Sequence, residues 1–584
     1  MDKFIAILYI ISCITWITGF YNIKKTDKTL NGCTFIVFSI FAFMCYQASI
    51  AFVLKYTFIT LNNLTFVICN LVMSALWGYV AVMKKNTQEY SYAVGDMVAY
   101  GIFTVAVLYI SSIQFGSSFD LFNYQCTWDS SVHLEFARDF AKSGELPKLY
   151  FMALNMGLWL QSVWAFNPFD TGCQMFIWLD IIILLMCACL FWHLLRYHIN
   201  SKGSYILGII FTLLYTLGYP LNNMVFGTSY LGSGNDIVIF LMIIMMLRIE
   251  DGLNKKIFAF TLLCGSIGLT VSYSLFTPIM FAAILIYFTV QYCKKKVIPR
   301  KVLISFMAVL LILGGIAVVL LQESFWNAVS GLEMEGQIYR NISLNFVFFV
   351  PFLLMAIKKT KTGSFSIIVF WMTAGYVLVC LLCVLTGHMS GYYYFKNYYV
   401  LWFTCFYISF QVIQEYMKND VFLRNYLIAW ALLLTVGMSR IGTKIDSYTD
   451  ELYGYGSVFG ELHIYNLFDL YRFNLGAMKS RPVDDGTRQL FLEAAEMNKT
   501  IQGSIYFVGA YQYALQKQFS AIANQPDIYY FDISSPEEYI QRIKDTSEYV
   551  CVVDPEYAYW DITEYLSTLE VIYENERGYI AKVQ

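Results

Sequence analysis

Phe4-Ile-Ala-Ile-Leu-Tyr-Ile-Ile-Ser-Cys-Ile-Thr-Trp-Ile-Thr-Gly-Phe20 is an unbroken apolar run, and three lysines, Lys24, Lys25 and Lys28, follow it. An apolar helix of this length crosses most of the roughly 30 Å of hydrocarbon in a bilayer. No small-residue cleavage site follows the run, so we interpret it as a retained membrane anchor and not as a cleaved signal peptide.

Apolar runs of similar length recur along the chain. Hydrophobic residues make up 58% of the sequence and charged residues 14%, whereas about a quarter of a soluble domain is charged. The sequence therefore predicts an all-α polytopic membrane bundle of about fourteen transmembrane helices. The spans are expected to begin near Phe4, Phe35, Phe58, Met97, Gln174, Tyr205, Asp236, Ile257, Thr277, Val302, Leu344, Phe365, Tyr398 and Phe422.

Clusters of lysine and arginine follow every second predicted span. Positively charged loops stay in the cytoplasm, so these clusters define the cytoplasmic side of the bundle. Both termini, the long loop 116–173 and the tail after Arg440 are then expected outside the cytoplasm. The clusters are Lys24/Lys25/Lys28, Lys84/Lys85, Arg196/Lys202, Arg248/Lys255/Lys256, Lys294/Lys295/Lys296/Arg300/Lys301, Lys358/Lys359/Lys361 and Lys418/Arg424.

The composition changes near Ser480, which divides a transmembrane domain (1–440) from a soluble extracytoplasmic domain (480–584). Short β-rich runs alternate there with helical ones, which predicts a small α/β domain. No glycine-rich phosphate loop or metal-ligand spacing occurs in it, so we favour a cap over the membrane part rather than an independent enzyme. The expected elements are strands at Ser504–Val508, Tyr549–Val553, Val571–Tyr573 and Tyr579–Val583, and helices at Pro536–Lys544 and Ile562–Thr568.

The long outer loop contains the segment Trp128-Asp-Ser-Ser-Val-His-Leu-Glu-Phe-Ala-Arg-Asp-Phe-Ala-Lys-Ser-Gly-Glu-Leu-Pro147. Helical spacing groups its apolar residues with His133 on one face, and groups Arg138 with the acidic residues on the other. We therefore expect an amphipathic helix on the outer membrane surface, ended by Gly144.

This segment resembles the first large outer loop of the GT-C superfamily of membrane glycosyltransferases. The similarity is greatest to bacterial lipid-A aminoarabinose transferases and protein O-mannosyltransferase-like enzymes. Asp129, His133, Ala137-Arg138 and Ser143-Gly144 fall at the family's offsets, while Ser130 replaces its usual Glu and His133 its usual Tyr. The resemblance implies a GT-C-like bundle that uses a polyprenyl-phosphate-linked sugar. The lost Glu leaves a divalent cation an open question.

Asp129 is the candidate catalytic residue. Glycosyl transfer needs a base to take the proton of the incoming hydroxyl, and partial desolvation at a membrane boundary can adapt a carboxylate to this task. The alternative is structural, because aspartate is also a favoured helix N-cap. The family resemblance favours the catalytic interpretation.

Outer-side cations are the candidates for binding the donor phosphate. Lys396, with Tyr393 close by, lies at the mouth of one span, and Arg340 lies at the entrance of another. Lys396 could instead extend to the interface among belt tyrosines. Arg138 and His133 join the candidate set through the family match, although Arg138 could pair with Glu135 or Asp139.

Two further carboxylates are candidate substrate-binding residues. Asp180 falls inside a predicted span, where an ionisable side chain is costly and suggests function, although it could simply bond a neighbouring helix. Asp170 lies at the outer boundary. Asp236 is expected only to cap the start of a span. The segment Phe226–Gly232 is expected to be a loose outer loop that could flank a substrate groove.

These observations favour a transferase of the cell membrane that moves a sugar to a cell-envelope glycan, lipid or protein. The net charge of −2 argues against nucleic acid as a partner. A transporter or flippase for lipid-linked glycans is an alternative, although no internal repeat supports it. A glycan polymerase or ligase is another. Residue usage and the resemblance favour a bacterial source.

Overall fold

The computed structural model describes residues 2–295 with gaps at 56, 58, 84–86, 117–127, 145–150 and 167–172. It also describes residues 346–416 and 424–429 apart from 347, 360–363 and 390, and residues 484–583 apart from 502–503, 510–518, 521–524, 526–532 and 555–559. A few single positions between these ranges, among them Tyr471 and Asn474, are described as well.

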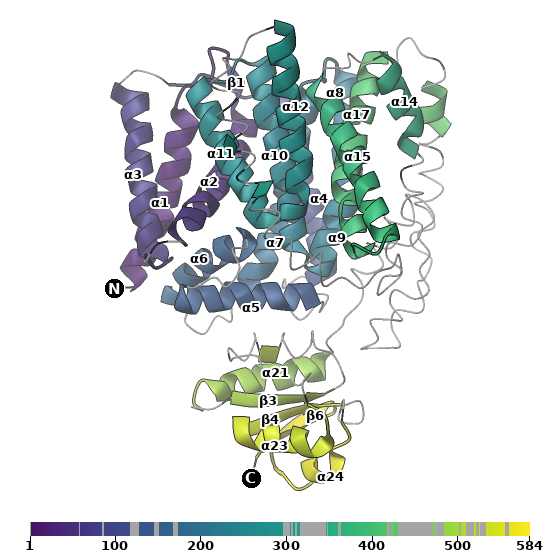
Figure 1. Cartoon of the computed structure of the whole chain (residues 1–584). Coiled ribbons are helices and arrows are strands. Elements are labelled where there is room, and N and C mark those ends of the chain that lie inside the picture. The colour runs from purple at the N-terminus through teal and green to yellow at the C-terminus, as the bar shows by residue number, and fades with distance from the viewer. Residues whose placement is uncertain are drawn as a thin grey trace.

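Long apolar helices form the larger part of the molecule (Figure 1). Within the described ranges, nine helices are long and apolar enough to cross a membrane, and a bent pair brings the number to as many as ten. The chain is therefore a multi-pass membrane protein. The helices of this part are α1 (Asp2–Asn22), α2 (Gly32–Leu54), α3 (Asn63–Gly78) with the π-turn η1 (Tyr79–Met83), α4 (Val94–Phe115), α7 (Cys173–Arg196), α8 (Lys202–Leu217), α9 (Tyr219–Phe226), α10 (Ser229–Glu250), α11 (Lys255–Ser272), the 3-10 turn η3 (Ser274–Phe276), α12 (Thr277–Lys295), α14 (Val350–Lys359), α15 (Phe365–Leu385), α16 (Gly391–Lys396) and α17 (Tyr398–Tyr416).

The prediction of about fourteen spans is only partly tested by these helices. The span expected near Leu344 corresponds to α14, which has only 10 residues. The spans expected near Val302 and Phe422 fall mostly outside the described residues. The span expected near Tyr205 is α8, which continues into α9 after a bend of 41°.

The bundle is organised around α10, whose apolar core is fully buried. It packs against α7 and α11, and α2 lies between these two helices. Peripheral helices instead expose apolar side chains outward, as Val72 on α3 and Val105 on α4 do at 68% each. Apolar surface of this kind is stable against lipid chains, which agrees with a membrane-embedded bundle.

The bend between α8 and α9 comes from Gly218 and Pro220. A Cβ atom at Gly218 would lie 2.4 Å from the Trp402 ring, so the backbone approaches this ring more closely than any other residue allows. The break frees carbonyl groups, and Asn474 donates to those of Leu217 and Gly218 at 2.9 and 2.7 Å. A residue far along the chain thus provides hydrogen-bond partners for the backbone carbonyls that the break leaves unpaired, as buried backbone groups require.

The basic clusters Lys24/Lys25/Lys28, Arg196/Lys202 and Arg248/Lys255/Lys256 meet at one end of the bundle. Lys28 pairs with Asp251 at 3.1 Å, and the Lys25 carbonyl accepts from the Asn254 amide at 2.7 Å. The short parallel pair β1 (Leu30–Asn31) and β2 (Tyr90–Ser91) lies at this end as well. Figure 1 shows α5, the N-terminus and the C-terminal domain at the opposite end, as expected if these clusters share one side.

The long loop contributes two helices, α5 (Trp128–Ser143) and α6 (Phe151–Phe166), which pack against each other. Figure 1 shows α5 lying crosswise between the bundle and the C-terminal domain. The expectation of a helix simply lying on the membrane surface is therefore corrected. One side of α5 meets the bundle, and Arg138 on the predicted polar side is buried beneath the C-terminal domain.

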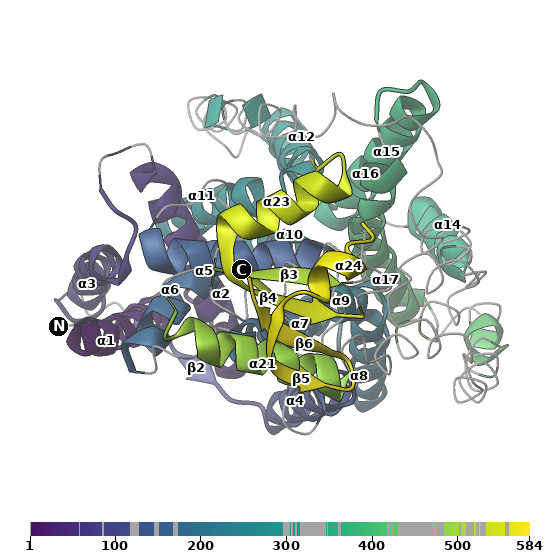
Figure 2. The same ribbon diagram turned by 90° about the horizontal axis from the view of Figure 1, so that it is seen from below.

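The C-terminal domain contains a four-stranded sheet in the order β3-β4-β6-β5. Strands β3 and β4 are parallel, and β6 runs antiparallel to β4 and β5. Each strand and helix predicted for this tail has a counterpart within a few residues. Figure 2, seen from below, shows the domain over the middle of the bundle. Its elements are α21 (Asp485–Asn498), β3 (Ser504–Gly509), α23 (Pro536–Thr546), β4 (Ser547–Val553), α24 (Thr563–Leu566), β5 (Glu570–Asn575) and β6 (Gly578–Lys582).

Candidate functional site

A basic and aromatic cluster lies where α5, α10, η3 and α16 come together. It consists of His133, Tyr230, Tyr273 and Lys396, and we call it the Lys396 cluster. The Lys396 side chain is only 3% exposed, and its Nζ donates a hydrogen bond to the Tyr230 hydroxyl. Nζ also lies 4.7 Å from the centroid of the Tyr230 ring and 5.6 Å from that of Tyr273.

His133 contacts the same tyrosine from α5. Its ring stacks on that of Tyr230 with centroids 4.6 Å apart and an interplanar angle of 30°. His133 is 6% exposed, so both basic side chains are largely withdrawn from water. The structure therefore brings together two of the predicted site residues, His133 and Lys396, through a residue that belongs to neither segment.

Local sequence explains how the two tyrosines are positioned. Ser233 and Ser272 join their hydroxyls at 2.7 Å, which ties the start of α10 to the end of α11. Gly234 allows close packing, because a Cβ atom there would lie 2.7 Å from the Cβ atom of Tyr273. Tyr230 and Tyr273 are thus held with their ring centroids 5.5 Å apart, and both rings contact the Lys396 side chain.

The cluster has the chemistry of an anion site. The Lys396 ammonium group contacts a hydroxyl and two aromatic rings, which are groups that stabilise a cation. Burial lowers the effective dielectric around the charge and strengthens its attraction for an anionic ligand. A phosphate oxygen is a suitable partner for such a group.

The other predicted residues are placed less completely. Asp129 lies in the first turn of α5, four residues before His133, but its side chain is outside the described residues. Arg340 and Asp170 also lie outside them. Tyr393 is half-buried on α16, where its carbonyl accepts from Asn397 at 2.9 Å.

Arg138 lies away from the Lys396 cluster and joins two parts of the chain. It is 2% exposed, and its Nη1 donates to the carbonyls of Ser520 and Gln525 at 2.9 and 2.8 Å. Its Nε and Nη2 contact the Asp139 carboxylate at 3.0 and 2.9 Å. Asp139 is one of the two ion-pair partners that the sequence offers for Arg138. The described contacts of Arg138 therefore connect α5 with the C-terminal domain.

Asp180 and Asp236 are buried inside the bundle. Asp180 on α7 is 3% exposed, consistent with the expectation of a carboxylate within a span. Asp236 was expected to cap a helix, which is wrong: α10 begins at Ser229, and Asp236 is fully buried two turns further on, beside the Cys187 thiol. A cap position requires exposed backbone amides, and the chain there is already helical.

Sequence reasoning missed Tyr230 and Tyr273 as site residues. Tyr230 belongs to Phe226–Gly232, which was expected to form a loose outer loop, but the segment is the junction of α9 and α10. In the sequence, a tyrosine near the start of an apolar helix cannot be distinguished from the tyrosines that commonly lie at a membrane interface. Among the described residues, no group of three or more His, Cys, Asp or Glu side chains could hold a metal ion.

Comparisons with known proteins leave the family open. No family model matches the chain, and no curated protein matches it. A solved structure, the crystal structure of ArnT from Cupriavidus metallidurans bound to undecaprenyl phosphate, aligns over 99% of this chain and 98% of that one. The identity is 9% and the TM-score 0.28, a likeness that defines neither the fold nor the function of this chain.

Proposed function

We propose that this protein is a membrane glycosyltransferase that transfers a sugar from a polyprenyl-phosphate donor to a cell-envelope acceptor. The reaction is placed at the end of the bundle that carries α5 and the C-terminal domain, outside the cytoplasm. The observation that carries the proposal is the buried Lys396 ammonium group, held on tyrosines beside His133 of the helix that resembles the GT-C outer loop.

In the proposed reaction Asp129 accepts the proton of the acceptor hydroxyl as its oxygen attacks the anomeric carbon of the sugar. The bond between that carbon and the phosphate oxygen breaks, and its electron pair leaves with the polyprenyl phosphate. Attack opposite the leaving group inverts the anomeric centre. Lys396 stabilises the negative charge that grows on the phosphate, which is where a fixed cation accelerates such a transfer.

The first experiment uses the full chain, purified and reconstituted in lipid nanodiscs, with a panel of radiolabelled polyprenyl-phosphate sugars and envelope extracts as acceptors. We expect one donor to be consumed with release of polyprenyl phosphate. Asp129→Asn is expected to lower turnover at least about 100-fold, the effect typical of losing a general base. If the unmutated chain consumes none of the donors, the proposal fails.

Lys396→Met tests the phosphate-binding role. It keeps the length and apolar stem of the side chain but removes the charge, so we expect a higher KM for the donor and a lower kcat. Lys142→Met is the matched control, because Lys142 is an exposed lysine near the end of α5. Equal kinetics for Lys396→Met and Lys142→Met would rule out Lys396 as the phosphate ligand.

A further inference from the structure

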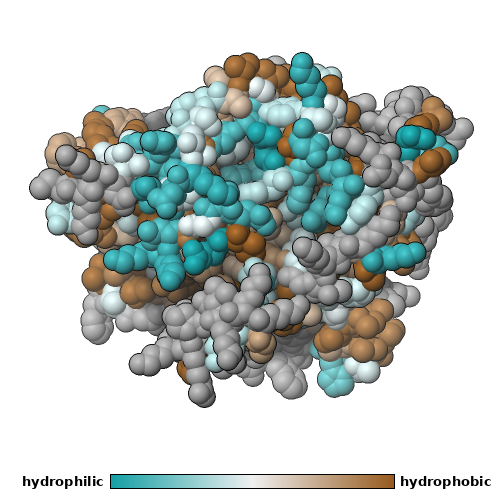
Figure 3. Space-filling view, turned by 90° about the horizontal axis from the view of Figure 1, so that it is seen from above, coloured by the Kyte–Doolittle hydropathy of each residue, from teal (hydrophilic) through white to brown (hydrophobic). Residues whose placement is uncertain are grey.

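A polar pocket lies at the other end of the bundle, far from the Lys396 cluster. It has a volume of about 170 Å³, which is room for a group of several non-hydrogen atoms. Figure 3 looks onto this face, where hydrophilic residues gather across the middle. The pocket is lined by Thr29, Leu30, Asn31, Thr34, Phe35, His193, Arg196, Tyr197, Leu247 and Asp251.

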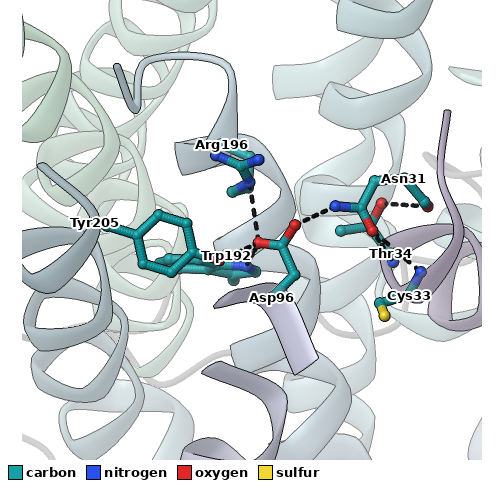
Figure 4. A network of polar contacts seen from close by, with 7 residues as sticks. All are labelled: Asn31, Cys33, Thr34, Asp96, Trp192, Arg196 and Tyr205. Carbon is teal, nitrogen blue, oxygen red and sulfur yellow. Dashed lines mark hydrogen bonds and ion pairs between the residues drawn. The ribbon is translucent and has the colours of Figure 1, made fainter. Parts of the chain in front are cut away.

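One wall of this pocket is fixed by the buried carboxylate of Asp96 on α4 (Figure 4). Asp96 is fully buried and accepts hydrogen bonds from the Asn31 amide, from Trp192 Nε1 at 3.2 Å and from the Tyr205 hydroxyl at 2.5 Å. It also pairs with Arg196 Nε at 3.0 Å. These contacts hold the side chains of Asn31 and Arg196, which both line the pocket.

Arg196 offers the rest of its guanidinium group to the pocket. Asp96 engages Nε, and within the described residues the two Nη groups make no hydrogen bond. The side chain is 31% exposed and lines the pocket, and its Cζ atom lies 5.3 Å from the centroid of the Tyr205 ring. Two adjacent Nη groups match the spacing of two oxygens in a phosphate or carboxylate.

His193 adds a second group that lacks a partner. It lies one helical turn before Arg196 on α7, on the same face, and it is 6% exposed. Its imidazole ring lines the pocket, and neither ring nitrogen has a hydrogen-bond partner among the described residues. A buried polar atom without a partner is unfavourable, and a ligand oxygen in the pocket would supply one.

The pocket also has an acidic side. Asp251, just after α10, accepts from the Tyr197 hydroxyl at 2.9 Å and from Lys28 Nζ at 3.1 Å. Two cationic side chains, Lys28 and Arg196, thus balance two carboxylates, Asp96 and Asp251. The N-terminus of α2 and the C-termini of α7 and α10 place opposite dipole ends around the same space. This balance favours neither a simple anion nor a simple cation.

We propose that this pocket binds a small zwitterion, in which a short linker joins an oxyanion to a primary ammonium group. The oxyanion contacts the guanidinium group of Arg196 and the imidazole of His193. The ammonium group contacts the Asp251 carboxylate. The same chemistry occurs in a free molecule such as phosphoethanolamine and in the headgroup of an aminophospholipid. The site is separate from the proposed transfer reaction and does not depend on it.

The test measures binding of defined probes to the full chain in phosphatidylcholine nanodiscs by isothermal titration calorimetry. We expect phosphoethanolamine to bind at least about tenfold more tightly than inorganic phosphate or ethanolamine, each of which satisfies one side of the pocket. Phosphocholine, whose methylated nitrogen cannot donate hydrogen bonds, is expected to bind at least about tenfold more weakly. Equal binding of phosphoethanolamine and inorganic phosphate would refute the zwitterion.

A second experiment distinguishes a lipid headgroup from a free small molecule as the ligand. Native mass spectrometry compares lipid retained from nanodiscs of phosphatidylethanolamine with lipid retained from nanodiscs of phosphatidylglycerol. Specific retention of phosphatidylethanolamine assigns the pocket to a lipid headgroup, while binding of the soluble probe alone assigns it to a free molecule. If neither the soluble probe nor the lipid binds, the proposal is overturned.

Variants then locate the binding. His193→Phe keeps an aromatic ring but removes both ring nitrogens, and Asp251→Asn removes the charge of the acidic side. Each is expected to weaken phosphoethanolamine binding at least about tenfold. His198→Phe is the matched control, because His198 bonds the Tyr407 hydroxyl at 2.9 Å and does not line the pocket. Thermal unfolding curves confirm that the variants are folded. Unchanged binding by both folded pocket variants would place the ligand elsewhere.

Discussion

Replacing Arg138 by methionine should release the C-terminal domain from α5 while leaving both parts folded. The arginine donates two charge-assisted hydrogen bonds to main-chain carbonyls, at 2.9 and 2.8 Å from Ser520 and Gln525. Gln525 is in turn bonded to Ile505 of β3, so the contact reaches the sheet. Methionine fills similar space and removes only the polar contact.

The size of the effect follows from these bonds. A hydrogen bond to a charged group contributes about 1.5–3 kcal/mol, and water entering the gap offsets part of the loss of two, which leaves about 3 kcal/mol. The pair with Asp139 adds little, because that carboxylate is 47% exposed. Since each 1.4 kcal/mol is a factor of ten, the undocked population should rise roughly 100-fold.

Hydrogen exchange followed by mass spectrometry measures this opening directly. We expect faster exchange in α5 and in the C-terminal residues that face it, and unchanged exchange in α10. Lys142→Met, which removes a cation from the same helix, serves as the control. The reasoning is refuted if Arg138→Met exchanges like the control, or if α10 accelerates equally, which would indicate general unfolding.

Three further outcomes are expected. Gly234→Ala should lower the unfolding free energy by about 1–3 kcal/mol, because the added methyl group would overlap Tyr273. Gly375→Ala is the control and should be nearly neutral, because there is open space around Gly375. A thermal unfolding assay compares the two variants. Tyr230→Phe removes the hydroxyl that accepts from the buried ammonium group and should cost about 1–2 kcal/mol in the same assay, with a raised KM if the proposed reaction is correct. Hydrogen bonds from neighbouring amide and hydroxyl groups lower the pKa of Glu537 and Asp561. Their stabilising effect is therefore present above the ordinary carboxyl pKa and is lost as pH falls through the lowered pKa values. Hydrogen exchange of the C-terminal domain should accelerate as pH is lowered below the ordinary carboxyl pKa, and less so in E537Q and D561N.

Each of these outcomes can fail separately. Equal melting of the two alanine variants would show that the backbone near Gly234 shifts at no cost. A Tyr230→Phe protein with unchanged stability would mean that the buried ammonium group does not depend on this hydroxyl. Exchange in the C-terminal domain that does not change with pH would show that the two carboxylates contribute nothing to its stability.

Properties that reside in one segment could be predicted from the sequence. Hydropathy alone indicated the apolar helices, because the cost of leaving backbone and polar groups in lipid acts on each span separately. Three of the basic clusters predicted to share a side do meet at one end, and alternation of short β-rich and helical runs located the elements of the C-terminal domain. The helix at 128–143 was found from its periodicity.

Contacts between distant segments were decided only by the tertiary structure. Arg138 looked like a surface residue of an amphipathic helix, yet the C-terminal domain covers it. Asp236 looked like a cap, yet α10 starts earlier and buries it. His133 and Lys396 were each proposed separately, and only the fold places Tyr230 between them. Hydropathy and periodicity describe which face of a segment avoids water, but the partner of that face depends on packing between helices that are far apart in the chain.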